Sequence, residues 1–211
     1  DAEWETKKRL RSGKGAVEPV YTIAEAAESL THIQGIGCDA MLEPAPHIEA
    51  RFRDEGHILG SAIVEVWVKE KGRKVKIVFS GDLGHKGIPI VKDPTYINDA
   101  DYILIESTYG NRQHKGMKET LDEFAEAVKE TLAKGGNVII PSFAVGRTQD
   151  ILYILNQLSR EGKLNQLNIF IDSPLATNAT RIVLKHPECF DKETLDLIIK
   201  GQFPKGTPIL T

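Results

Sequence analysis

Apolar and polar positions alternate over residues 47–56 and 61–81, the pattern of strands with one buried face. In the first stretch Ile48, Ala50 and Phe52 share one face, and charged or polar residues occupy most of the other. In the second stretch the turn "EKGR" separates two apolar runs, of which the later ends in "IVFSG". Residues 47–81 are therefore predicted to form a β-meander that feeds one sheet.

The pattern changes near residues 95–105, where short apolar runs begin to alternate with helical stripes. Strands are predicted over 101–107, 137–142 and 167–174, and helices over 118–136, over 146–162 and from Ala176 onward. Before the meander, Thr22 is predicted to cap a helix over 23–33. Alternating strands and helices predict an α/β fold with parallel strands, and a boundary between two regions near residue 100.

The length allows one large domain or two small ones with a substantial core, since 41% of the 211 residues are apolar and 27% are charged. The net charge of −3 argues against a generally basic nucleic-acid coat but is compatible with a local basic groove. The densest basic cluster (Lys7, Lys8, Arg9, Arg11 and Lys14) is interpreted as a solvated helix end and loop.

Cysteine usage and hydropathy favour a cytoplasmic protein. No apolar stretch approaches the ~18 residues that span a bilayer, so no membrane partner is expected. The first residues, "DAEWETKKRLRSGKG", are charged where a signal peptide would be apolar. Cys38 and Cys189 lack a C-x-x-C spacing and are predicted to be free thiols in a reducing compartment.

A single carboxylate, Asp82, follows the last strand of the meander in "SGDLG". Small neighbours would let such a carboxylate approach a cation or a substrate closely. The same five residues also suit an ordinary turn, because Asp favours turns and Gly tolerates positive φ. By itself this motif therefore leaves both interpretations open.

His57 lies in a second loop of the same predicted sheet, in "DEGHILGSA". A lone histidine is more commonly a structural hydrogen-bonding residue, yet His57 and Asp82 both lie where a strand meets a loop. A histidine and an aspartate that converge in this way suit zinc. Two ligands are too few for a complete site, so the others must come from elsewhere.

Polar side chains also follow the three predicted strands of the second region. Glu106 follows the first strand, in "LIESTYGNRQH", and is either a site residue or a helix cap. Ser142 and Arg147 follow the second strand, near a helix start whose backbone N–H groups favour phosphate. Because open α/β sheets bind ligands at the carboxyl ends of their strands, these loops are candidate binding loops.

Five ordered segments together resemble the β-CASP branch of the metallo-β-lactamase superfamily: "GHILGSA", "FSGDLGHKG", "LIESTYGNRQH", "PSFAVGRTQDILYIL" and "FIDSPLA". This branch contains nucleic-acid phosphodiesterases, among them RNA-processing nucleases. The resemblance covers roughly residues 47–176. It implies that residues 1–100 are the C-terminal part of a metallo-β-lactamase αββα sandwich, and that residues 101–211 are the N-terminal part of a β-CASP domain.

The resemblance also implies roles for single residues. His57 matches a zinc ligand, and Asp82 matches the aspartate that bridges two zinc ions and takes part in catalysis. Glu106 matches a catalytic acidic residue that orients a histidine. His114 is expected to face the substrate cleft, together with Ser142 and Arg147.

The expected reaction is zinc-dependent hydrolysis of RNA by a hydroxide held between two zinc ions, with single-stranded RNA in the cleft. A homodimer is compatible with this interpretation. The family's H-x-H-x-D-H signature and its later histidine motifs do not occur in the chain. The chain is therefore expected to be the middle of a longer enzyme, with weak or no zinc binding and little activity by itself.

Two rival hypotheses remain at this point. A metallo-β-lactamase hydrolase acting on a small ester or thioester would share His57 and Asp82 but would not need the "ESTYG" region. A catalytically inactive scaffold or RNA-binding subunit of the β-CASP type would not need His57, Asp82 and Glu106, all of which are present.

Overall fold

The computed structural model describes residues 2–113, 115–165 and 167–201. The chain divides into two compact units, residues 1–37 and residues 38–211, and each is described here by itself. Within the described residues no helix is both long enough and apolar enough to cross a bilayer.

The first unit contains two short helices, α1 (Ala2–Leu10) and α2 (Ile23–Ser29), and a 3-10 turn, η1 (Leu30–His32). The predicted cap at Thr22 is confirmed: its hydroxyl accepts a hydrogen bond from the Glu25 N–H at 3.2 Å, and the Glu25 carboxylate accepts the Thr22 N–H at 2.6 Å. This reciprocal pair is a capping box. The basic cluster lies at the end of α1 and in the residues after it, as predicted.

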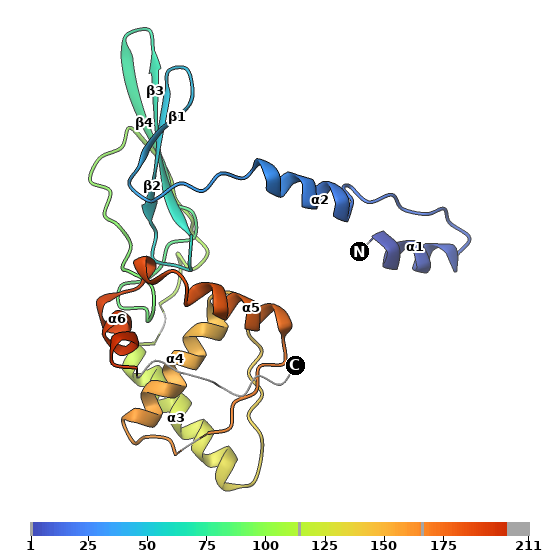
Figure 1. The fold of residues 1–211 in the computed structure, drawn as a ribbon, viewed down its shortest axis with the longest axis vertical. Coiled ribbons are helices and arrows are strands. Elements are labelled where there is room, and N and C mark those ends of the chain that lie inside the picture. Colours follow the sequence, from blue (N-terminus) through green and yellow to red (C-terminus); the bar gives the residue numbers. More distant parts are fainter. Residues whose placement is uncertain (1, 114, 166, 202–211) are drawn as a thin grey trace. The chain divides into compact units, whose positions relative to one another are not determined.

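The described residues of the second unit form one five-stranded sheet, with the strands β1 (Met41–Ala45), β2 (Ile48–Asp54), β3 (Ala62–Glu70), β4 (Arg73–Phe79) and β5 (Tyr102–Leu104) in that spatial order. Figure 1 labels the first four strands. The β1–β2, β2–β3 and β3–β4 pairs are antiparallel, and β4–β5 is parallel. The β-meander and the strand after residue 100 are thus confirmed. β1 was not predicted, because Pro44 obscures its pattern; as an edge strand it tolerates a proline.

The β3–β4 turn shows how the local sequence sets the strand register. Lys71 and Gly72 both have positive φ, 48° and 78°, as a two-residue type I′ hairpin requires. This turn pairs Glu70 with Arg73 and, further along, Glu65 with Val78. The register therefore determines which residues of β3 lie opposite the end of β4.

One face of the meander carries a buried ionic cluster. The Glu65 side chain is 1% exposed and forms ion pairs with Arg51 Nη2 and Lys76 Nζ, both at 2.7 Å. The Trp67 ring lies within 5.4 Å of the charged groups of Arg51, Lys74 and Lys76. Each buried charge therefore has a partner of opposite sign, as a low-dielectric environment demands.

Among the described residues, four helices follow the sheet: α3 (Met117–Ala133), α4 (Arg147–Arg160), α5 (Pro174–Val183) and α6 (Lys192–Ile199), with a 3-10 turn η2 (Pro187–Cys189) between the last two. The three predicted helices are confirmed. Helix α4 contributes to all three clusters of buried apolar residues. Its Leu155 and Leu158 pack with Ala125 and Val128 of α3, which lies beside it in Figure 1.

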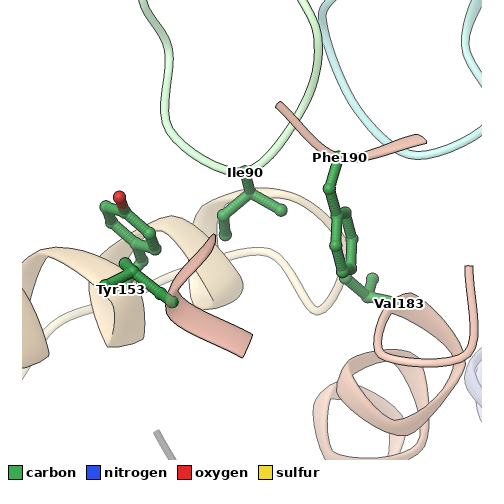
Figure 2. Close-up of a cluster of buried hydrophobic side chains, with 5 residues drawn as sticks. Ile90, Tyr153, Val183 and Phe190 are labelled. Carbon is green, nitrogen blue, oxygen red and sulfur yellow. The ribbon is translucent and has the colours of Figure 1, made fainter. Parts of the chain in front are cut away.

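A second cluster joins α4 and the later helices to the loop after β4. Ile90 from that loop packs with Tyr153 of α4, Val183 of α5 and Phe190, as Figure 2 shows, and with Leu197 of α6. Phe190 is only 1% exposed. The backbone supports this contact, because the Asp191 N–H donates to the Ile90 carbonyl at 2.9 Å. The loop that begins at Ser80 is therefore anchored to the helical layer.

The predictions of strands at 137–142 and 167–174 are wrong for this structure. Both segments carry no strand assignment, and Ile139 and Phe170 are 88% and 58% exposed. A strand requires a partner backbone, and the parallel pairing within the described residues consists of β4 with β5. The fold is nevertheless mixed α/β, as predicted. The domain boundary near residue 100 stays a prediction.

Candidate active-site loop

The loop after β4 is held through its backbone N–H groups. The N–H of Asp82 is close enough to the carboxylate of Glu55 to oppose the rise in its pKa. The Leu83 N–H donates to Glu106 Oε1 at 3.0 Å. The Gly84 N–H donates to the Glu55 carbonyl oxygen at 3.1 Å. Residues 82–84 are thus tied to the segment before His57 and to the segment after β5.

The parallel β4–β5 pair brings Glu106 to this loop. The Ser80 N–H donates to the Leu104 carbonyl at 2.9 Å, which continues the ladder beyond the strand ends. The Ser80 hydroxyl then accepts the Glu106 N–H at 3.1 Å and donates to the Gly81 carbonyl at 2.8 Å. The carboxyl ends of two adjacent parallel strands therefore place Asp82 and Glu106 at the same edge of the sheet.

The two glycines of "SGDLG" are favoured for different reasons, a positive φ at Gly81 and a close backbone approach at Gly84. Gly81 has φ of 62°, and a Cβ atom built on it would lie 2.5 Å from Glu55 Oε2. A Cβ on Gly84 would lie 1.7 Å from the Gly56 carbonyl oxygen. Larger residues at either position would push the loop away from residues 55–57. The glycines therefore bring the Asp82 loop against the His57 segment.

His57 is exposed and follows the buried pair Glu55 and Gly56. Together with Ile58 it lines a small pocket whose other wall includes Gly146 and Asp150, at the start of α4. Gly146 has φ of 81°, and a Cβ atom there would lie 2.6 Å from Ile58 Cγ2. The structure therefore brings the first turn of α4 next to the histidine.

The charges of this region influence one another. Burial raises the pKa of Glu55, the N–H of Asp82 and the charge of His57 oppose that rise, and the carboxylates of Asp82 and Glu106 add to it. The pKa of Glu106 is lowered, first by hydrogen bonding to the Thr108 hydroxyl and backbone and then by the Leu83 N–H. These mutual effects place His57, Asp82, Glu55 and Glu106 in one electrostatic neighbourhood.

Asp150 is the most perturbed acid of the site. Burial raises its pKa from 3.8 to about 6, although the charges of Arg147 and His57 act in the opposite direction. An acid with a pKa this close to neutrality, beside a candidate metal ligand, is a functional-site signal. In the sequence its only signal was an acidic residue in the first turn of a predicted helix.

The structure brings some of the predicted site residues together. Asp82 lies in the loop that contacts Glu106 through Leu83 and the His57 backbone through Gly84. The exposed Arg147 begins the helix that carries Asp150. Ser142 lies in the exposed segment before α4. His114 lies outside the described residues. Glu55 was not singled out, because a glutamate at the end of an alternating strand is ordinary in sequence; its burial, at 3% exposure, reveals it.

The side chains at positions 57 and 82 are of kinds that zinc accepts, an imidazole and a carboxylate. Among the residues that the structure describes, no group of three or more His, Cys, Asp or Glu side chains is arranged to hold a metal ion. No complete ligand set therefore follows from the described residues.

Comparison with known proteins finds the same family that the sequence motifs resemble. Residues 148–210 match the model of the Beta-Casp domain. A ribonuclease of Thermus thermophilus is 33% identical over 187 residues, which is 89% of this chain and 42% of the relative. An RNase J-like protein of Methanocaldococcus jannaschii is 38% identical over 144 residues, 66% of this chain and 33% of the relative.

A third relative has a different name. The transcription termination factor FttA of Methanosarcina mazei is 31% identical over 190 residues, which is 87% of this chain and 29% of that protein. The chain thus spans less than half the length of each of these three relatives.

Proposed function

Because the chain belongs to the β-CASP branch of the metallo-β-lactamase superfamily, we propose that its site takes part in metal-dependent hydrolysis of RNA phosphodiester bonds. The observation that carries the proposal is the bond from the Leu83 N–H to Glu106 Oε1 at 3.0 Å, which joins the Asp82 loop to the acid that follows β5. RNA is the proposed substrate because two relatives are named as a ribonuclease and an RNase J-like protein.

In this proposal His57 and Asp82 would hold zinc, as two ligands of a two-ion site. When bound, two zinc ions supply a hydroxide nucleophile near neutral pH and offset the charge on the phosphate. Glu106 holds the loop that carries Asp82, through the bond to Leu83. Arg147, at the exposed start of α4, is positioned to meet an RNA phosphate, with Ser142 in the segment before it.

Metal-dependent RNA cleavage by the full-length protein tests this function. Asp82→Ala and His57→Ala should each reduce cleavage of a labelled single-stranded RNA by several orders of magnitude and weaken zinc binding. Asp39→Asn is the matched control, because that carboxylate is 68% exposed and pairs with Arg53 on the meander. RNA binding without cleavage, unchanged by Asp82→Ala, would contradict the proposal and favour an RNA-binding scaffold.

The 211-residue chain by itself gives a second test. With two proposed ligands it should bind zinc weakly and cleave RNA poorly. Cleavage at the rate of the full-length protein, lost in Asp82→Ala, would show that these 211 residues hold a complete site. The measurement is a side-by-side rate comparison at the same zinc and RNA concentrations.

A further inference from the structure

We propose that Glu55 is a positioning residue that sets the place of the Asp82 carboxylate by holding the backbone of residues 81–84. The inference rests on the proposed function of Asp82 as a metal ligand. Glu55 does not act on the substrate or the metal in this scheme. It acts through the loop, which it contacts at two points.

Two contacts from one residue fix the loop on both sides of the Asp82 peptide. The Glu55 carboxylate lies against the Gly81–Asp82 peptide, since a Cβ atom on Gly81 would stand 2.5 Å from Glu55 Oε2, and the N–H of Asp82 opposes the rise in the carboxyl's pKa. The Glu55 carbonyl oxygen accepts the N–H of Gly84 at 3.1 Å. Because Glu55 holds the backbone at Asp82, the Asp82 carboxylate cannot change its place unless this contact is lost. Groups that do not touch the metal but hold its ligands orient those ligands in metal sites.

The carboxylate of Glu55 is also in direct contact with the residue before Asp82. A Cβ atom on Gly81 would lie 2.5 Å from Glu55 Oε2 and 3.1 Å from the carboxyl carbon. Glu55 is itself 3% exposed, so its side chain has little freedom to move. The loop therefore rests on a buried, fixed group, whereas the Asp82 side chain is exposed and free to bind a ligand.

The group required at position 55 is a hydrogen-bond acceptor. An apolar side chain would leave the Asp82 N–H without the acceptor beside it. A glutamine would keep a carbonyl oxygen at the same distance from the backbone, and its neutral amide would avoid a third carboxylate beside Asp82 and Glu106. Glu55→Gln should therefore rescue what Glu55→Ala loses.

The test compares Glu55→Ala, Glu55→Gln and the control Glu70→Ala in the full-length protein stripped of metal. Glu70 is a suitable control because its side chain is 75% exposed at the far end of β3. The first measurement is the affinity for Co²⁺ alone, followed by its visible absorption. Glu55→Ala should weaken Co²⁺ binding by about 10–100-fold, the usual effect of losing a group that orients a metal ligand. Glu55→Gln and Glu70→Ala should bind like the wild type.

The second measurement is amide hydrogen exchange of Asp82 and Gly84 without metal. Exchange of the Asp82 amide should become faster in Glu55→Ala and stay near wild type in Glu55→Gln. Unchanged exchange in Glu55→Ala would overturn the inference. Normal Co²⁺ affinity in Glu55→Ala would also overturn it, provided that Asp82→Ala loses Co²⁺. If Asp82→Ala keeps its Co²⁺ affinity, the proposed function fails, and exchange at Asp82 alone decides whether Glu55 holds the loop.

Discussion

Gly84 lies directly against Gly56: a Cβ atom on Gly84 would stand 1.7 Å from the Gly56 carbonyl oxygen and 2.8 Å from the His57 backbone nitrogen. The contact joins the loop of Asp82 to the segment of His57, main chain to main chain. Neither segment can move away from the other without displacing Asp82 or His57. The proposed pair of metal ligands is therefore coupled through the backbone as well as through the metal.

Gly84→Ala should separate the two segments. We expect a loss of about 1–3 kcal/mol in the free energy of unfolding from overpacking and weaker zinc binding, because the Asp82 loop must move away from His57. Urea denaturation and zinc titration measure the two effects. Gly37→Ala is the matched control, since a Cβ atom there meets nothing within 4 Å. Equal stability and equal zinc affinity in both variants would contradict the close approach.

Caps and turns, which depend on neighbouring residues, could be predicted from the sequence. Contacts between segments that are distant in the sequence were mostly missed. The Thr22 cap and the Lys71–Gly72 turn follow from neighbouring residues, and both are observed. The segment 137–142 has the composition of a buried strand, but a strand needs a partner backbone that composition does not provide.

The candidate site shows the same division. His57, Asp82 and Glu106 could be selected from the sequence because each lies in a recognisable motif at a strand end. Glu55 could not, because its role depends on an N–H donated by a residue that lies beyond two further strands. The glycines of "SGDLG" were predicted to give a cation room, and the structure adds that they admit residues 55–57.

Removing Glu65 should be among the most destabilising changes in the meander. Glu65→Ala leaves Arg51 and Lys76 without their buried anion, and the expected loss is about 3–5 kcal/mol in the free energy of unfolding. Lys69→Ala breaks an exposed ion pair with Glu49 and should cost much less, because solvent screens the two charges. Urea denaturation of the two variants gives the comparison. Similar losses in both would mean that burial adds nothing to the Glu65 cluster.

The raised pKa of Asp150 predicts a pH-dependent stability. In the native state the carboxyl holds its proton up to about pH 6, whereas its ordinary pKa is 3.8. Between these values the native state binds more protons than the unfolded state, so this residue's contribution falls as pH rises from about 4 to 6.

Asp150→Asn removes that dependence, because asparagine resembles the neutral acid. In metal-free protein the variant should exceed the wild type in the free energy of unfolding by at most about 3 kcal/mol above pH 7, and by almost nothing near pH 4. Denaturation in urea across this pH range, with a chelator present, measures the difference. A difference between the two proteins that stays constant with pH would rule out a titrating Asp150.

Two substitutions of Glu106 can distinguish a role in holding the loop from a role in proton transfer. Its Oε1 accepts the Leu83 N–H at 3.0 Å and its Oε2 accepts the Thr108 N–H at 3.3 Å. Glu106→Ala removes both acceptors, so amide exchange of Leu83 and of Thr108 should accelerate. Glu106→Gln keeps one acceptor oxygen and replaces the other with an N–H donor.

With its amide oxygen toward Leu83, Glu106→Gln should protect the Leu83 amide and release the Thr108 amide. If Glu106 serves only to hold the loop, Glu106→Gln should keep most of the RNA cleavage that Glu106→Ala loses. Loss of cleavage in Glu106→Gln with normal exchange at Leu83 would instead assign the carboxyl a role in proton transfer. Because the exchange measurement needs neither metal nor RNA, it reports on the loop independently of the chemistry.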